Sequence, residues 1–264
     1  MGELRQFVHR PIGALQPYVR EIMWVGSERP RQQMLLPETR LTLVLRQSGA
    51  ASMRNQVLPK AVVSGVQHQP RVIEHSRGSS LIIVRFTEIG AHAIFHERMD
   101  LLYGRTEPLD AMMPAREVDR VQNALADTPD ARNQLLHVER FLTSRIRAQY
   151  GVPQQIQAAV QMIRNSDGRS SIGAIAQRTA MSQSALERHF RAAVGATPKR
   201  MSRLARLHHV FRLWATGKNF TRIAYEAGYF DQPHLVRDFR LFTGFSPEEF
   251  FRMDPAHNLP IFYK

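Results

Sequence analysis

The chain has 264 residues, a formal net charge of +13 and no cysteine. Because cysteine is missing, disulfides, thiolate zinc sites and cysteine-based oxidant sensing are excluded, and the basic balance favours polyanionic partners. No apolar stretch approaches the ~20 residues of a membrane span, and residues 1–10 lack a signal-peptide core. We therefore expect a cytoplasmic protein of two medium-sized domains, with no membrane partner.

Residues 1 to about 105 are predicted to form a β-rich domain. Short apolar runs rich in β-formers occupy residues 41–45, 61–63 and 81–86, and residues 21–25 are predicted as a fourth strand. Gly, Pro, Ser and Asn cluster between these runs. Several short strands separated by turns are typical of a sandwich or a barrel.

After the last of these strands the pattern becomes helical. Residues 97–103 and 115–126 are predicted as short helices and residues 130–149 as a long one. Its apolar stripe consists of Leu135, Val138, Leu142 and Ile146. The stripe either docks on the β-rich domain or forms a dimer seam, and we favour docking because that surface is nearest. Residues 151–153, Gly-Val-Pro, then break the helix and mark a boundary between residues 1–150 and a second domain.

Histidines in the first domain raise the question of a metal site. They are His68, His75, His92 and His96, and none forms a His-x-His pair. The run from His96 to Asp100 resembles a zinc-binding helix motif but has Asp where the second His should stand. We interpret these histidines as surface or hydrogen-bonded residues, and we expect no metal and no cofactor.

One motif occurs twice in the second half of the chain. The first copy is Leu186-x-Arg188-x-Phe190-Arg191-x-x-x-Gly195-x-Thr197-Pro198, and 49 residues later the second is Leu235-x-Arg237-x-Phe239-Arg240-x-x-x-Gly244-x-Ser246-Pro247. In each copy Leu and Phe lie four residues apart, so they share one helix face and can anchor it. The arginines then fall on or beside the solvent face. The Gly is suited to end the helix in a left-handed conformation, and the Pro cannot continue it.

A short apolar segment and a tight turn precede each copy. The segments contain Ile172, Ile175 and Ala176 in one case and Ile223, Ala224 and Ala227 in the other. Ser182 and Asp231 are predicted N-caps of the helices that follow, although neither is completed to a capping box. A helix, a turn and a capped helix with outward arginines form the helix-turn-helix pattern, whose second helix enters the DNA major groove.

The second copy and its upstream segment resemble AraC/XylS-type bacterial transcription regulators. The matching residues are Ala224-x-x-Ala227-Gly228-Tyr229-x-Asp231-Gln232-x-His234-Leu235-x-Arg237-x-Phe239-Arg240 and Gly244-Phe245-Ser246-Pro247. The resemblance covers roughly residues 153–252. It implies a DNA-binding domain of seven helices, in which a long helix at residues 198–216 joins two subdomains.

The first half is similar to the cupin-like N-terminal halves of some AraC-type regulators. The similarity lies in the order of Pro17-Tyr18-Val19, Leu36-Pro37-Glu38 and Gly90-Ala91-His92-Ala93. The expected fold class is therefore α+β. A cupin-like β-rich domain with trailing helices spans residues 1–150, an all-α domain of about seven helices spans residues 153–252, and residues 253–264 form a tail. The resemblance makes the first domain the usual seat of effector binding.

The base-facing positions are those in the first two turns of each capped helix that do not anchor the core. They are Gln183, Ser184, Glu187 and Arg188 in the first helix, and Gln232, Pro233, His234 and Arg237 in the second. Arg188 and Arg237 are the strongest candidates because Arg pairs bidentately with guanine, and a phosphate contact is the alternative. Arg191 and Arg240 lie one turn further and are expected to touch phosphates. Residues 197 and 246 either donate to the DNA backbone or cap the next helix.

The sequence predicts a sequence-specific transcription regulator, activator or repressor, and not an enzyme. A rigid connector would hold the two recognition helices about one DNA turn, ~34 Å, apart, so that they read successive major grooves. The first domain would then modulate DNA binding, homodimer formation or contact with RNA polymerase. One alternative is a ligand-free regulator whose first domain is only an assembly module, and another is a cupin-type metalloenzyme with a DNA-binding appendage. A packed barrel interior would favour the assembly module, whereas an open apolar pocket would favour an effector.

Overall fold

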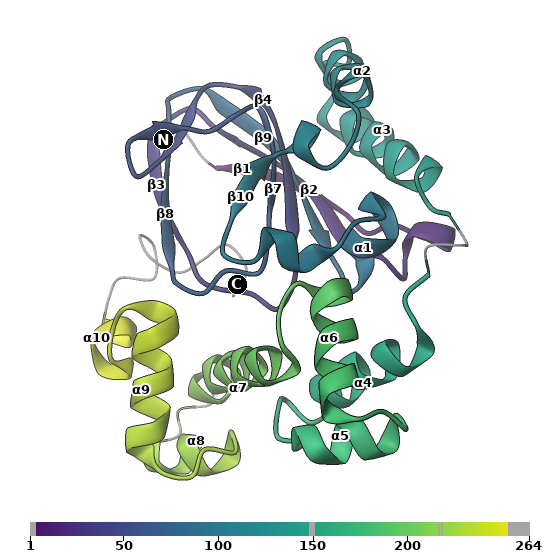
Figure 1. Cartoon of the computed structure of the whole chain (residues 1–264). Helices are drawn as coiled ribbons and strands as arrows, with labels where there is room; N and C mark the ends of the chain where they lie inside the picture. The colour runs from purple at the N-terminus through teal and green to yellow at the C-terminus, as the bar shows by residue number, and fades with distance from the viewer. Residues whose placement is uncertain (1–3, 148–150, 216, 218, 253–264) are drawn as a thin grey trace.

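The computed structural model describes residues 4–147, 151–215, 217 and 219–252. Strands fill the first part of the chain and helices fill the second, which confirms the α+β class. In Figure 1 the sheets form the upper body, and the green and yellow helices of the second part lie below it. None of the described helices is both long and apolar enough to cross a bilayer.

The strands form two antiparallel sheets. One has six strands in the order β1-β2-β9-β4-β7-β10, and the other has four in the order β3-β8-β5-β6. Their bounds are β1 (Arg5–His9), β2 (Val19–Ser27), β3 (Arg31–Leu35), β4 (Thr42–Ser48), β5 (Ala51–Met53), β6 (Gln56–Val57), β7 (Ala61–Ser64), β8 (Arg71–His75), β9 (Ser79–Phe86) and β10 (Thr106–Pro108). The four predicted strands are confirmed as β2, β4, β7 and β9. The others were not predicted because they are very short or largely polar, as in β3 with the sequence RQQML.

The six-stranded sheet buries both of its faces. Leu43, Leu45 and Ile82 share one apolar core with the helices that follow the sheets. Val44 and Ile83 lie on the opposite face, which points to the space between the two sheets. Burial on both faces explains why β4 and β9 are nearly continuous apolar runs rather than alternating ones.

The helices that follow the strands depart from the prediction in two places. Helix α1 (Gly90–Phe95) ends at His96, which adopts the left-handed conformation with φ 62°. The predicted helix at residues 97–103 is therefore wrong, and a short 3-10 turn (Met99–Leu102) stands there instead. Helix α2 (Ala115–Ala126) has the predicted bounds.

Helix α3 (Ala131–Ser144) is shorter than predicted. It ends before Arg145, whose Nε donates to the carbonyl of Ile94 at 3.1 Å and whose guanidinium pairs with Glu117. Gln149, the predicted end, lies outside the described residues. Leu135, Val138 and Leu142 are buried against the sheet, so the favoured docking of the stripe is confirmed.

The second part of the described chain contains seven helices, as the resemblance implied. They are α4 (Gln154–Asn165), α5 (Ile172–Arg178), α6 (Gln183–Val194), α7 (Pro198–Trp214), α8 (Phe220–Glu226), α9 (Gln232–Thr243) and α10 (Pro247–Arg252). Helix α7 is the predicted connector and ends at Trp214 rather than near Thr216, which lies outside the described residues. The tail predicted at residues 253–264 also lies outside them.

The connector carries an aromatic cluster that packs the second subdomain. Phe211 meets Phe239 edge-on at 5.5 Å between ring centroids. Trp214 stacks on Phe251 at 4.2 Å and on Phe220 at 4.8 Å. Phe211 and Trp214 are therefore packed into the core of this subdomain.

Candidate DNA-binding surface

The two recognition helices, α6 and α9, begin and end as the motif predicted. Ser182 Oγ accepts a hydrogen bond from the backbone N–H of Ala185 at 3.2 Å, and Asp231 Oδ1 accepts one from His234 at 2.7 Å. The C-caps, Gly195 and Gly244, adopt φ values of 84° and 83°. These local bonds satisfy amide groups that a helix end leaves without intrahelical partners, so each helix is specified by its own sequence.

The anchoring residues of both helices are fully buried. Leu186, Phe190, Leu235 and Phe239 are each 0% exposed. The core around them also contains the buried side chains of Ile175, Ile223, Tyr229 and Phe242, and the half-buried Ile172 and Phe245 pack against it. One face of each helix is thus held by the protein, and the opposite face remains for another partner.

The four predicted arginines lie on that open face. Arg188, Arg191, Arg237 and Arg240 are exposed, and none of them forms an ion pair with another described residue. The Arg188 guanidinium lies with Nη2 3.4 Å from His189 Nε2. Four unpaired guanidinium groups on two helices provide hydrogen-bond donors for phosphates or base edges.

The remaining candidate positions are also accessible. Gln183, Ser184, Glu187, Gln232 and Pro233 are exposed, whereas His234 is half-buried. His234 meets the ring of Tyr229 edge-on at 5.1 Å, so it is partly engaged within the protein. Gln232 Oε1 accepts a long hydrogen bond from Thr221, at 3.4 Å.

The connector α7 lies between the two recognition helices. In Figure 1, α6 and α9 stand on either side of α7, with α5 and α8 at the end away from the sheets. The side chain of Thr197 caps α7 by accepting from Arg200, and Ser246 with Glu249 forms a capping box at α10. Capping is therefore the role these two hydroxyls have in the structure.

The sequence did not predict an ion pair that joins α9 to the connector. Asp238 is 3% exposed, and its carboxylate accepts from Arg203 Nη2 at 2.6 Å and from Nε at 3.2 Å. The hydrogen bond to Asp238 raises the pKa of Arg203. Asp238 occupies the same helix face as Leu235 and Phe242. A carboxylate within this apolar stripe is the sequence feature that could have predicted a buried ion pair.

Part of the first domain borders the open face of α6. Arg98 and Asp100 line a shallow hollow together with Ser184, Glu187, Arg188 and Arg191. The hydrogen bond from Arg98 lowers the pKa of Asp100, with a smaller contribution from Arg191. A side chain at position 195 would meet the carbonyl of Met99 at 2.9 Å, so the end of α6 packs closely against this segment.

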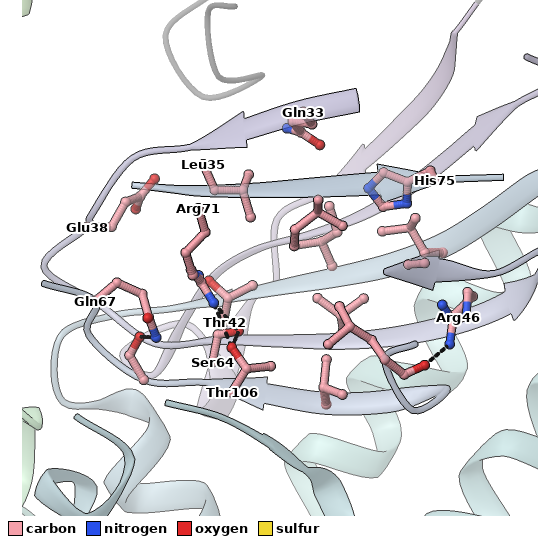
Figure 2. Close-up of a pocket in the computed structure, with 18 of the residues that line it drawn as sticks. Gln33, Leu35, Glu38, Thr42, Arg46, Ser64, Gln67, Arg71, His75 and Thr106 are labelled. Carbon is pink, nitrogen blue, oxygen red and sulfur yellow. Dashed lines mark hydrogen bonds between the residues drawn. The ribbon is translucent and has the colours of Figure 1, made fainter. Parts of the chain in front are cut away.

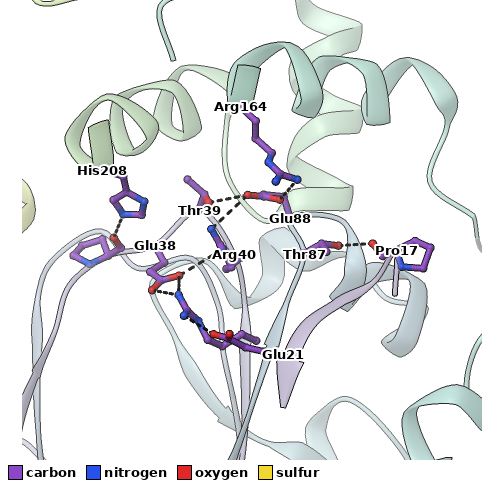
Figure 3. A network of polar contacts seen from close by, with 11 residues as sticks. Pro17, Glu21, Glu38, Thr39, Arg40, Thr87, Glu88, Arg164 and His208 are labelled. Carbon is purple, nitrogen blue, oxygen red and sulfur yellow. Dashed lines mark hydrogen bonds and ion pairs between the residues drawn. The ribbon is translucent and has the colours of Figure 1, made fainter. Parts of the chain in front are cut away.

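A polar network joins the sheets to the helical part (Figure 3). His208 of α7 lies with Nε2 3.3 Å from the carbonyl of Pro37, in the loop between β3 and β4. In the same loop, Thr39 donates to Glu88 at 3.1 Å, and Glu88 pairs with Arg164 of α4 at 3.7 Å. The loop at residues 36–40 therefore takes part in the polar contacts between the two parts.

An apolar cavity lies between the two sheets (Figure 2). Strands of both sheets line it, and so do Leu36, Glu38 and Arg40 of the 36–40 loop. His75 of β8 is in its wall, half-buried and with Nδ1 lacking a hydrogen-bond partner among the described residues. His75 is thus only partly at the surface, because the pairing of β8 with β3 and β5 turns this side chain toward the cavity.

The other histidines are placed as expected or differ only in detail. His92 Nδ1 lies 2.8 Å from the carbonyl of Glu97, the His68 ring lies tilted beside that of Tyr103 with 6.1 Å between ring centroids, and His96 ends α1. No group of three or more His, Asp or Glu side chains in the described part of the chain is arranged to hold a metal ion.

Comparisons with known proteins agree with this geometry. Residues 175–253 match the family model of a helix-turn-helix domain, and residues 8–108 match a domain of unknown function (DUF6597). No curated protein matches the chain.

Several solved structures align with this chain at low sequence identity. ToxT from Vibrio cholerae with a bound unsaturated fatty acid is 11% identical with a TM-score of 0.45, over 97% of this chain and 99% of ToxT. The C-terminal domain of AraT from Geobacillus stearothermophilus is 18% identical with a TM-score of 0.36, over 43% of this chain and 98% of that domain. The AraC-like activator CuxR is 11% identical with a TM-score of 0.29, over 84% of this chain and 91% of CuxR.

The capped helices, their open basic faces and the family match define a DNA-binding protein of the helix-turn-helix class. Its two helix-turn-helix units are joined by α7. The predicted helix-turn-helix DNA-binding domain is therefore confirmed in the second part of the chain.

Proposed function

We propose that α6 and α9 bind successive major grooves on one face of a DNA duplex. The observation that carries this proposal is the repeated arrangement of two capped helices, each with a buried Leu and Phe and an open pair of arginines, on either side of α7. A connector of this kind fixes the spacing of the two helices. If that spacing is shorter than one DNA turn, the duplex must bend, at a cost of order 1–6 kcal/mol.

Arg188 and Arg237 are assigned to base recognition, and Arg191 and Arg240 to phosphates. The assignment follows from their place along each helix, because the first turns of a recognition helix enter the groove and later turns approach the backbone. The other proposed contacts to bases or backbone are made by Gln183, Ser184, Glu187, Gln232, Pro233 and His234. A guanidinium can donate two parallel bonds to guanine, which gives Arg the largest share of the specificity.

The matched pair Arg237→Ala and Arg240→Ala tests this assignment. The wild-type chain is first used to select a bound sequence from a pool of random duplexes. Anisotropy titrations then measure the affinity of each variant for the selected duplex and for a scrambled one. Arg237→Ala is expected to cost ~1–3 kcal/mol on the selected duplex and much less on the scrambled one. Arg240→Ala is expected to weaken both about equally and to reduce the salt slope by about one.

A third variant controls for the loss of positive charge alone. Arg77 is exposed in the turn between β8 and β9, in the first domain, and Arg77→Ala is expected to leave both affinities unchanged. Equal losses on the two duplexes for Arg237→Ala would contradict base recognition. A wild-type chain that bound no duplex at low salt would contradict the proposed function as a whole.

The first domain is proposed to modulate DNA binding through the loop at residues 36–40. The loop touches both the cavity and α7, so a ligand in the cavity and the position of the connector are coupled through the same backbone. The open apolar cavity supports an effector-binding domain over the alternative, a purely structural assembly module. A change in the first domain would alter transcription through DNA binding, through homodimer formation or through contact with RNA polymerase.

A further inference from the structure

The cavity between the sheets combines apolar walls with buried positive charge. Its apolar lining includes Leu35, Val44, Leu58, Val62, Ile73, Leu81 and Ile83. Three arginines, Arg40, Arg46 and Arg71, also line it, together with a single carboxylate, that of Glu38. Apolar walls with a few polar groups are the usual chemistry of a site for a small organic molecule.

The one carboxylate is already engaged. Glu38 accepts two hydrogen bonds from Arg85 Nη2, at 2.7 and 2.9 Å, and lies 3.6 Å from Arg40. The remaining bonds of Arg85 include one to Glu21, at 2.7 Å. In the network of Figure 3, Arg40 and Arg85 are therefore both paired with carboxylates.

Arg71 and Arg46 have no carboxylate partner among the described residues. Arg71 Nη1 donates to the hydroxyls of Thr106 and Ser64, at 2.6 and 3.2 Å, and Arg46 Nη2 donates to the carbonyl of Leu58. The Nε–H groups of both arginines are buried with no acceptor in the part of the chain that the structure describes. In Figure 2 the two guanidinium groups lie at different ends of the cavity, with Arg71 beside the hydroxyls and Arg46 toward His75.

Arg71 is the stronger anchor for an anion. Burial lowers its pKa to about 10, which leaves it charged at neutral pH. Its hydrogen-bond acceptors among the described residues are hydroxyls, which are neutral, so its charge is not balanced within the described structure. A buried charge without a counter-charge is costly, and a ligand that supplies the opposite charge removes that cost.

We propose that this cavity binds a small organic anion, a monocarboxylate with a compact apolar body, whose carboxylate pairs with the guanidinium of Arg71. The ligand's carboxylate accepts hydrogen bonds from the guanidinium of Arg71, and its apolar body packs against the apolar side chains that line the cavity. The inference rests on the proposed role of the first domain as the effector-binding part. It adds the chemical class of the effector.

The size of the cavity limits the ligand. Its volume is about 100 Å³, and an apolar cavity of roughly 150 Å³ is known to hold benzene. The cavity is smaller than the one that holds benzene, so we expect short-chain monocarboxylates rather than long acyl chains. Inorganic phosphate, which has no apolar body, is expected to bind poorly because it gains nothing from the walls.

The test compares carboxylates with neutral molecules of the same shape on the wild-type chain without DNA. The probes are butyrate, hexanoate and benzoate, each paired with its amide, and inorganic phosphate. Thermal shift and isothermal titration calorimetry measure binding. At least one carboxylate is expected to bind at least about tenfold more tightly than its amide. Equal binding of every acid and its amide, or no binding by any carboxylate at millimolar concentration, would overturn the proposal.

Two variants separate a role in ligand binding from a structural one. Arg71→Met is expected to abolish the preference for the acid, and without ligand its Tm should equal or exceed that of the wild type because a buried unpaired charge is gone. A clear fall in Tm would instead mean that the charge supports the fold. The matched control, Arg105→Gln, alters an arginine that is 68% exposed and should keep the preference. A control variant that lost it would also contradict the assignment to Arg71.

The outcome is independent of the proposed DNA contacts. Anisotropy with the selected duplex is measured on the same wild-type preparation. Failure of every carboxylate with intact DNA binding overturns only the ligand class. Failure of DNA binding with intact carboxylate binding overturns the proposed function and leaves the site.

Discussion

The ion pair between Asp238 and Arg203 sets how α9 sits on the connector, and its removal should be costly. The side chain of Asp238 is 4% exposed and that of Arg203 is 29% exposed, and two charge-assisted bonds join them. Breaking a buried pair by deleting one partner costs about 3–5 kcal/mol, because the other charge stays buried and unpaired. Since solvent reaches part of Arg203, we expect Asp238→Ala to cost ~2–3 kcal/mol, below the fully buried range.

An exposed pair in the adjacent helix provides the matched control. Glu248 and Arg252 of α10 are an i,i+4 pair whose side chains are 67% and 79% exposed. Exposed pairs of this kind contribute only ~0.3–0.5 kcal/mol, so Glu248→Ala should cost little. Replacing both partners of the buried pair, Arg203→Met with Asp238→Leu, should recover most of the lost stability because no unpaired charge remains.

Urea unfolding of each full-length variant, followed by circular dichroism and by tryptophan fluorescence, measures these differences. Trp214 lies at the end of α7 beside the same aromatic cluster and reports on this subdomain. The reasoning is refuted if Asp238→Ala costs no more than Glu248→Ala, or if the double variant is less stable than the single one. Either result would show that the pair does not hold α9 to the connector.

Two further predictions concern charge in the first domain. Burial, with the charges of Arg31 and Arg46, lowers the pKa of His75 to about 4 from 6.5. In this pH range the unfolded chain binds a proton at His75 and the folded chain does not, so the stability of the wild type falls as pH drops from about 6.5 to about 4. The Tm of His75→Gln should therefore fall less than that of the wild type over the same pH range. Asp100→Asn removes a negative charge beside Arg191 and should tighten DNA binding by up to about fivefold at low salt. The gain, measured by anisotropy, should shrink as salt is added, and a salt-independent change would contradict an electrostatic cause.

The sequence by itself determined the parts that depend on neighbours a few residues away. The bounds of α6 and α9, their caps at Ser182 and Asp231 and their closing glycines follow from hydrogen bonds that span three or four residues. The buried and open faces follow from the helical period, because the spacing of the apolar residues and the arginines along one helix decides which face each occupies. The motif occurs twice with the same spacing, so the same local pattern predicts both helices.

Only the tertiary structure decided which distant side chains meet. His208 reaches the carbonyl of Pro37 across 171 residues, and Arg71 meets Thr106 across 35. Neither pairing has a sequence spacing that predicts it, because strand order and the docking of one domain on the other set such distances. The same holds for the end of α3, where contacts of Arg145 with α1 and α2 accompany the stop that periodicity alone would place later. Local hydrogen bonds specify the DNA-binding helices, whereas the packing of the two sheets creates the charged cavity.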